Sequence, residues 1–184
     1  MLFDEFEPNS YKVNYTEGGK FHFIEGPDVQ IPKFYCQWGV SKTQYEGSPP
    51  RYYIDLFLHE GERSSKFVEW LARLEDHIVE YVKENEMSIF GREGQDISSM
   101  YKNLLVDNKI RIKLDRETVA KEKGKHEIVN VLEENKLKGM NVVCMLRVKM
   151  LYFMEGKFGL SLTAPQLEFS EAEQPKKRIL FLNH

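Results

Sequence analysis

The sequence predicts an α+β fold, in which a small, strongly curved and mostly antiparallel sheet or barrel is covered by one long helix. Segments of alternating apolar and polar residues, the pattern of half-buried strands, occur on both sides of a single long stretch with helical periodicity. The last patterned segment, Lys138–Phe169, contains two alternating runs joined at Glu155-Gly156, a glycine-containing turn signal. Together these features favour a closing β-hairpin in a sheet interrupted by one helix.

The length of 184 residues suits one domain with a substantial core. We expect a weakly structured N-terminal arm at 1–20, a single domain at 21–169 and a C-terminal tail at 170–184. Because the net charge is only −3, any nucleic-acid site would be a local basic patch. The Lys176-Lys177-Arg178 run in the tail is too short to assign to a phosphate contact or a nuclear address, and a solvated end is the simpler interpretation.

Apolar runs in this sequence are shorter than the roughly 18–20 residues of a membrane span. The acidic start, MLFDEFEPNS, lacks the basic and apolar regions of a secretory signal. The two cysteines, Cys36 and Cys144, fall on predicted apolar strand faces, so we expect buried free thiols. We therefore expect an intracellular protein that does not bind a membrane.

Three strands are predicted before the helix. Phe21–Ile24 ends at a Gly26-Pro27 turn signal, and Lys33–Val40 and Arg51–Leu58 alternate clearly. Alternation assigns these residues to the core face: Phe34, Cys36, Trp38, Val40, Tyr52, Ile54, Leu56 and Leu58.

The clearest helix is Ser64–Glu86, with Ser64 or Ser65 as its expected cap. A shorter helix is expected at Ile97–Val106, capped by Asp96. Apolar residues recur along the long helix at steps of three and four, which predicts one buried stripe: Phe67, Trp70, Leu71, Leu74, Ile78, Tyr81 and Val82.

After the helices, Lys109–Leu114 alternates as a strand, and the charged segment Asp115–Lys125 is expected to be a mobile loop. His126–Leu132 could be a strand or a short helix. In the closing hairpin, alternation assigns these residues to the core face: Val142, Cys144, Leu146, Val148, Met150, Tyr152, Phe158, Leu160, Leu162 and Ala164.

The sequence contains no catalytic signature. The Gly18-Gly19-Lys20 run lacks the spacing and the Ser or Thr of a phosphate-binding loop. The five histidines are scattered, and two isolated cysteines cannot form a four-ligand metal site. We expect a protein that is not an enzyme and needs no cofactor or metal; a nuclease would require a carboxylate cluster and activity with Mg²⁺.

The opposite faces of the strands combine cations with large flat side chains. Cations can neutralise phosphates, and exposed rings can stack on unpaired bases, so this mixture suits single-stranded nucleic acid. We expect phosphate contacts from Arg51, Lys109, Arg111, Lys113, Arg147, Lys149 and Lys157, and stacking from Tyr35, Tyr53, Phe57, Phe153 and Phe158, with Lys33 and Met145 on the same face. A sheet face that is merely solvated would also carry lysine and arginine, and a register slip of one residue would reverse any strand.

The closing segment, CMLRVKMLYFMEGKFGLSLTAPQLEF, resembles the single-stranded-DNA-binding protein family of nucleocytoplasmic large DNA viruses. In that family a strand L-R-x-x-x-L-W/Y-F leads into a G-K-x-F/W-G turn and a final strand with a glutamine. The matching residues here are Leu146, Arg147, Leu151, Tyr152, Phe153, Gly156, Lys157, Phe158, Gly159 and Gln166. The final strand departs from the pattern: it lacks the family's aromatic near Ser161–Leu162, and Pro165 interrupts it.

The resemblance implies an OB-like barrel that binds single-stranded DNA in replication or recombination, in the cytoplasm or nucleus of an infected cell. We therefore expect a non-catalytic, weakly sequence-specific single-stranded-DNA-binding protein. RNA binding, self-association and contacts with replication proteins remain open. The alternative is a structural or assembly protein, such as a minor virion β-protein, whose aromatic face contacts another protein.

Overall fold

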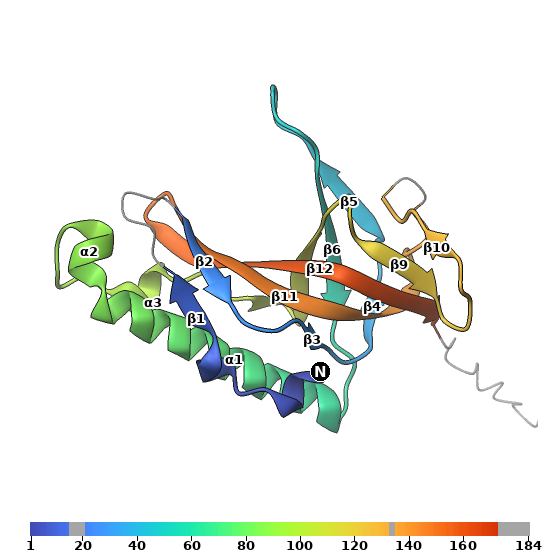
Figure 1. The fold of residues 1–184 in the computed structure, drawn as a ribbon, viewed down its shortest axis with the longest axis horizontal. Coiled ribbons are helices and arrows are strands. Elements are labelled where there is room, and N and C mark those ends of the chain that lie inside the picture. Colours follow the sequence, from blue (N-terminus) through green and yellow to red (C-terminus); the bar gives the residue numbers. More distant parts are fainter. Residues whose placement is uncertain (15–20, 133–134, 173–184) are drawn as a thin grey trace, which may run out of the picture.

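The structure is a computed structural model that describes residues 1–14, 21–132 and 135–172 (Figure 1). It is a mixed α+β fold with one long helix and a large, mostly antiparallel sheet, as expected. In chain order the elements are the 3₁₀ turns Phe3–Glu5 and Pro8–Ser10, β1 Lys12–Asn14, β2 Phe21–Glu25, β3 Val29–Gln30, β4 Phe34–Cys36, β5 Val40–Thr43, β6 Arg51–Phe57, α1 Glu62–Glu84, α2 Glu86–Phe90, α3 Ile97–Met100, β7 Leu105–Val106, β8 Lys109–Leu114, β9 Val119–Glu122, β10 Ile128–Val129, β11 Met140–Met154 and β12 Lys157–Glu171.

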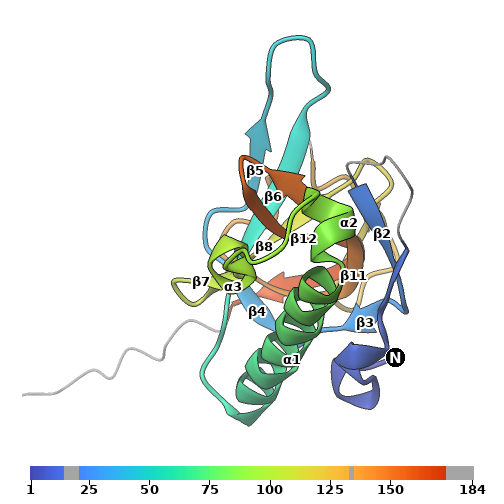
Figure 2. The same cartoon turned by 90° about the vertical axis from the view of Figure 1, so that its left-hand side faces the viewer.

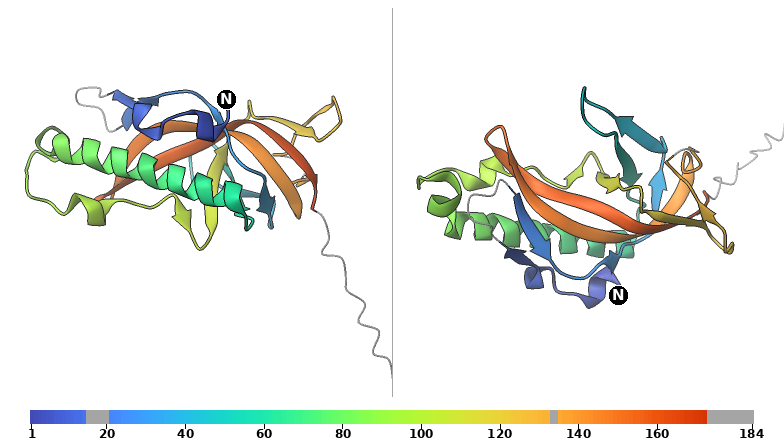
Figure 3. Two further views of the ribbon diagram at one scale, coloured as in Figure 1. Left: turned by 90° about the horizontal axis from the view of Figure 1, so that it is seen from below. Right: turned by 45° about the horizontal axis from the view of Figure 1, so that its top comes forward.

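The sheet curves because β11 pairs with both β4 and β12. The strands β11, β4, β6, β8 and β12 thereby form a closed circuit of pairings, an OB-like arrangement. Two joints in this circuit are short, since β4 meets β6 only at Tyr35 and Phe57, and β12 meets β8 only at Thr163 and Lys113. Helix α1 runs along one side of the β11–β12 hairpin, and we call the opposite side of the sheet the outer face (Figure 3).

Helix α1 forms where the sequence indicates, and its apolar stripe fills the core. Phe67, Trp70 and Leu74 are at most 1% exposed. The expected serine cap is wrong, because Gly61 is the N-cap residue and the Ser65 hydroxyl instead donates to the Gly61 carbonyl at 3.3 Å. No helix within the described parts of the chain is long and apolar enough to span a membrane.

The β11–β12 hairpin is confirmed, and its turn is left-handed at both central residues, Glu155 at φ 54° and Gly156 at φ 72°. Its register shifts between Met145 and Arg147 and again between Val148 and Met150. The second irregularity reverses the alternation, so Leu151 is buried and Phe153 packs on the core. The core facing predicted for Met150 and Tyr152 is therefore wrong.

The N-terminal residues do not form the expected weakly structured arm. Phe3 is fully buried, and Tyr11 is only 2% exposed. The indole N–H of Trp70 donates to the Phe6 carbonyl at 2.8 Å, and Arg73 pairs with Glu7 at 2.7 Å. The segment is thus packed against α1 as part of the domain, because its aromatic side chains complete the core beside the helix.

The stretch predicted as one strand at Lys33–Val40 is two strands, β4 and β5, separated at Gly39, which has φ 78°. Phe34 and Cys36 are buried as expected, but Trp38 is 51% exposed. The core position predicted for Trp38 is therefore wrong. The buried free thiols of Cys36 and Cys144 are confirmed.

The second predicted helix is shorter than expected and ends at Met100. Asp96 caps it, accepting the Ser99 N–H at 3.3 Å. Beyond it, the Lys102 N–H donates to the Phe158 carbonyl at 2.8 Å and the Leu104 N–H to the Glu75 carboxylate at 2.6 Å. Those tertiary bonds replace the helical ones and lead the chain into β7.

The charged segment Asp115–Lys125 is not a simple loop, since it contains β9, which runs parallel to β12. The ambiguous stretch His126–Leu132 contributes the short strand β10. The charge-rich sequence did not predict β9, because its partner β12 lies far along the chain, whereas β10 pairs with the nearby β9. The predicted boundary of a tail at 170 falls within β12, and the Lys176-Lys177-Arg178 run lies outside the described residues.

Candidate nucleic-acid interface

Strand pairing brings predicted site residues from different segments together on the outer face. One row across the sheet contains Tyr35, Phe57 and Lys109. Another runs from Tyr53 through Lys113 and Thr163 to Arg147. Directly paired residues point to the same face, so the residues of each row share one face of the sheet.

At one end of the outer face lies an aromatic group that we call the Trp38 cluster: Tyr35, Trp38, Phe57 and Lys109. The Trp38 and Phe57 rings meet edge to face, with 5.0 Å between centroids. The Lys109 ammonium lies 5.5 Å from the Trp38 centroid, in cation–π geometry. Alternation assigned Trp38 to the core. It is exposed because the strand is interrupted between Cys36 and Val40, where Gly39 turns the chain.

The centre of the face holds Tyr53, Asp55 and Arg111. Arg111 donates from Nε and Nη2 to the two Asp55 oxygens at 2.7 and 2.8 Å, and its guanidinium carbon lies 5.9 Å from the Tyr53 centroid. The hydrogen bond from Arg111 lowers the pKa of Asp55. On β11, Tyr152 is accommodated by the absence of a side chain at Gly159, where a Cβ would lie 2.9 Å from the tyrosine hydroxyl.

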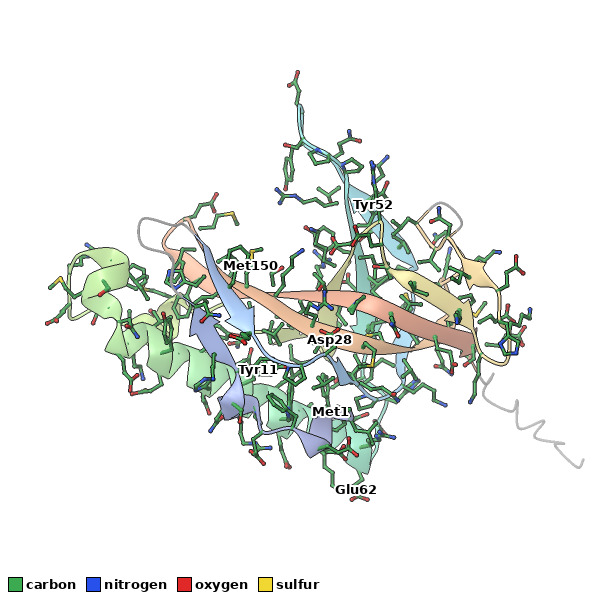
Figure 4. The ribbon with its side chains drawn as sticks, viewed as in Figure 1. Met1, Tyr11, Asp28, Tyr52, Glu62 and Met150 are labelled. Atoms are coloured by element: carbon green, nitrogen blue, oxygen red, sulfur yellow. The ribbon has the colours of Figure 1, made fainter. Side chains whose placement is uncertain are left out.

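Two further groups of paired basic and acidic side chains lie on the β11 side of the face. Arg147 donates from Nε and Nη2 to both oxygens of Asp28 at 2.7 Å. Asp115 lies between two lysines, with Lys113 at 3.2 Å and Lys149 at 3.6 Å. Figure 4 shows Asp28 beside the β11–β12 hairpin, well away from Glu62 at the start of α1.

The aspartates are the component that sequence reasoning missed. Asp28, Asp55 and Asp115 contact Arg111, Lys113, Arg147 and Lys149, so the basic face is partly neutralised from within. An arginine has five N–H donors, and each of these arginines uses its Nε and one Nη in the pair. The remaining donors can reach a ligand oxygen, since the side chains of Arg111 and Arg147 are 62% and 51% exposed.

Four predicted residues lie away from these rows or in the core. Arg51 lies over the Tyr45 ring at 5.9 Å, on the β5–β6 hairpin, which projects from the side opposite α1 (Figure 2). The Lys157 ammonium donates to the Ser99 carbonyl at 2.7 Å, beside the β11–β12 turn. Phe158 is fully buried and stacks with Phe153 at 5.8 Å, so neither ring has the outer-face position expected of a stacking residue.

The last predicted residue, Lys33, is exposed immediately before β4. Within the described residues there is no group of three or more histidine, cysteine, aspartate or glutamate side chains that could hold a metal ion. The cations and rings of the outer face offer recognition by charge, hydrogen bonding and ring contact.

No family model matches this chain, and neither does any curated protein sequence. Solved structures do match. The single-stranded DNA-binding protein from bacteriophage Enc34 in complex with ssDNA has a TM-score of 0.54 and 14% identity, covering 90% of this chain and 98% of that one. The gp2.5 single-stranded DNA binding protein encoded by bacteriophage T7 has a TM-score of 0.51 and 11% identity, covering 84% of this chain and 97% of that one.

The TM-scores and coverages show a shared fold over nearly the whole of both phage proteins. The structural neighbours are phage single-stranded DNA-binding proteins, whereas the sequence resemblance concerned nucleocytoplasmic large DNA viruses. That narrower family assignment stays a prediction.

Proposed function

We propose that this protein binds single-stranded DNA through the outer face, without catalysis and with little sequence preference. The observation that carries the proposal is the convergence of Tyr53, Lys109, Arg111 and Arg147 from three separate strands on one face. The fold shared with two phage proteins that are described as single-stranded DNA-binding proteins supports the same function.

Single strands fit this face better than duplex does. Half-buried and exposed rings on a sheet can stack on bases only when the bases are unpaired, and each such contact is worth roughly 1–3 kcal/mol. The cations among the rings can neutralise phosphates and release counterions, which gives affinity without base readout. Binding on this face should therefore depend on salt, and the paired aspartates should make that dependence less steep than the cations alone would give.

The biological setting belongs to the same proposal. The viral resemblance and the phage neighbours favour a role in coating DNA during viral replication or recombination, inside the infected cell. Binding of RNA, self-association and recruitment of replication proteins are further parts of this proposal, and binding titrations with each partner test them.

The test is a fluorescence-anisotropy titration with labelled oligo-dT at two salt concentrations. Arg147→Ala/Lys149→Ala should weaken binding. It should also reduce the magnitude of the slope of log K against log salt concentration by about 1.4, the value for two lost single-strand phosphate contacts. Lys66→Ala/Arg73→Ala is the matched control, since it removes one lysine and one arginine from ion pairs on α1, each with an N–O distance of 2.7 Å. Absence of binding by the unmodified protein at low salt would refute the proposal.

A specific observation also favours a second function, that of an assembly protein. Phe23 is 54% exposed and pairs with Met150 across β2 and β11, so the outer face continues into an apolar strip. A protein partner on that strip would give association that is insensitive to salt and unaffected by oligonucleotide. Sedimentation with and without oligo-dT distinguishes the two functions.

A further inference from the structure

We propose that Trp38 is a base-stacking residue, and that Phe57 and Lys109 complete a subsite for one unpaired nucleotide. This inference rests on the proposed function and goes beyond it by assigning a particular ligand group, the nucleobase, to a residue that the sequence placed in the core. No part of the family pattern in the closing hairpin includes Trp38.

Trp38 is 51% exposed, whereas the second tryptophan, Trp70, is 1% exposed and lies in the core. Leaving so large an apolar side chain in water forfeits the favourable free energy of its burial, roughly 25 cal/mol for each Å². A bound base would cover that surface.

The loop that carries Trp38 is held in place by hydrogen bonds on both sides. Strand β4 ends at Cys36, and Gly39, with φ 78°, turns the chain immediately before β5 begins at Val40. The Asn135 side chain accepts the Val40 N–H at 3.0 Å, and it occupies the space that a Cβ on Gly39 would need. The Gly139 N–H donates to the Cys36 carbonyl at 2.8 Å on the other side of the loop. A ring that is already positioned loses less entropy when a ligand binds.

The neighbours of the Trp38 ring also suit a nucleotide. Phe57 packs against Trp38 at an interplanar angle of 74°, which supports the ring. The Lys109 ammonium, 5.5 Å from the ring centroid, places a positive charge within reach of the phosphate of a nucleotide whose base covers Trp38. An exposed aromatic ring beside a lysine ammonium matches a nucleotide better than it matches an apolar protein side chain.

Intrinsic fluorescence tests the inference directly, because the protein has only two tryptophans and Trp70 is a buried reference. Titration with unlabelled oligo-dT should quench the tryptophan emission. The midpoint of this quenching should equal the midpoint of the anisotropy titration with a labelled oligonucleotide. Trp38→Leu should abolish the quench and weaken binding roughly 5- to 150-fold, the range expected for one stacked base. Trp38→Phe should retain more of the affinity.

Two controls accompany these variants. Met87→Ala removes another exposed apolar side chain, from α2, and should bind as the unmodified protein does. An abasic oligonucleotide of the same length presents phosphates without bases, and should bind more weakly and leave the emission unquenched. The remaining Trp70 emission reports whether Trp38→Leu is folded.

The outcomes separate the inference from the proposed function. Normal binding by Trp38→Leu, or binding by the unmodified protein without quenching, overturns the role of Trp38 and leaves DNA binding intact. Failure to bind any oligonucleotide at low salt overturns both. Quenching that depends on protein concentration and needs no DNA identifies a protein contact at Trp38 and overturns the inference.

Discussion

Arg147 and Asp28 lie 119 positions apart in the sequence, yet two guanidinium N–H groups of Arg147 reach the two oxygens of Asp28 at 2.7 Å. Asp55 and Arg111 repeat this arrangement on the neighbouring part of the face, at 2.7 and 2.8 Å. In both pairs the carboxylate is less exposed than the guanidinium, at 27% against 51% and 10% against 62%. The aspartates therefore orient the arginines on the sheet while reducing the net charge that a nucleic acid would meet.

Asp28→Asn should strengthen binding of oligo-dT at low salt, because it removes a negative charge beside Arg147 and leaves an amide of similar shape. We expect an increase of about two- to fivefold, equivalent to about 0.5–1 kcal/mol, that fades at high salt. Anisotropy titrations measure it. Glu7→Gln, which releases Arg73 on the helix side, is the control, and weaker binding by Asp28→Asn would show that orientation outweighs charge.

Stability should depend on pH through Asp55. The hydrogen bond from Arg111 lowers the pKa of this carboxyl below its ordinary 3.8. A carboxyl whose pKa is lower in the folded state stabilises the fold above its unfolded pKa, and the contribution is lost as the pH falls through the folded value. Urea unfolding at a series of pH values below about 5 should show a smaller acid loss in Asp55→Asn. Equal losses in the two proteins would contradict this assignment.

The packed N-terminus predicts a large effect of Phe3→Ala. Phe3 is fully buried and meets the Phe67 ring edge to face, with 5.3 Å between centroids. Its removal should cost about 3–5 kcal/mol in the free energy of unfolding, measured by urea denaturation. Phe23→Ala, at a residue that is 54% exposed, should stay within about 0.5 kcal/mol. Similar values for the two variants would indicate that the N-terminal segment is not part of the core.

The hairpin turn predicts two substitutions of opposite sign. Gly156→Ala should destabilise the fold by about 1 kcal/mol, because φ is 72° there and no neighbouring atom lies within 4 Å of an added Cβ, so only backbone strain contributes. Glu155→Asn should stabilise it by a few tenths of a kcal/mol, since asparagine adopts φ near 54° more readily. Thermal unfolding measures both, and a stabilising Gly156→Ala would contradict the turn geometry.

Local pattern was sufficient for the elements with long, uninterrupted periodicity. Helix α1, strands β6 and β8 and the β11–β12 hairpin were all predicted within a few residues, because alternation or a helical stripe repeats several times in each. The alternation pattern gave the wrong facing where a local irregularity interrupts the in–out order of side chains along a strand. Gly39 exposes Trp38, and the irregularity after Val148 moves Phe153 to the core side, although strict alternation places each on the other face.

The sequence by itself determined the fold class, the core stripe of α1 and the mixture of cations and rings on the strands, since these follow from residue type and spacing. Only the tertiary structure decided that the cations share their face with Asp28, Asp55 and Asp115, that Phe158 is buried and that Trp38 is exposed. Those relationships depend on which strands pair and in which register. The ion pair between Asp28 and Arg147 joins residues 119 positions apart, and no local pattern records it.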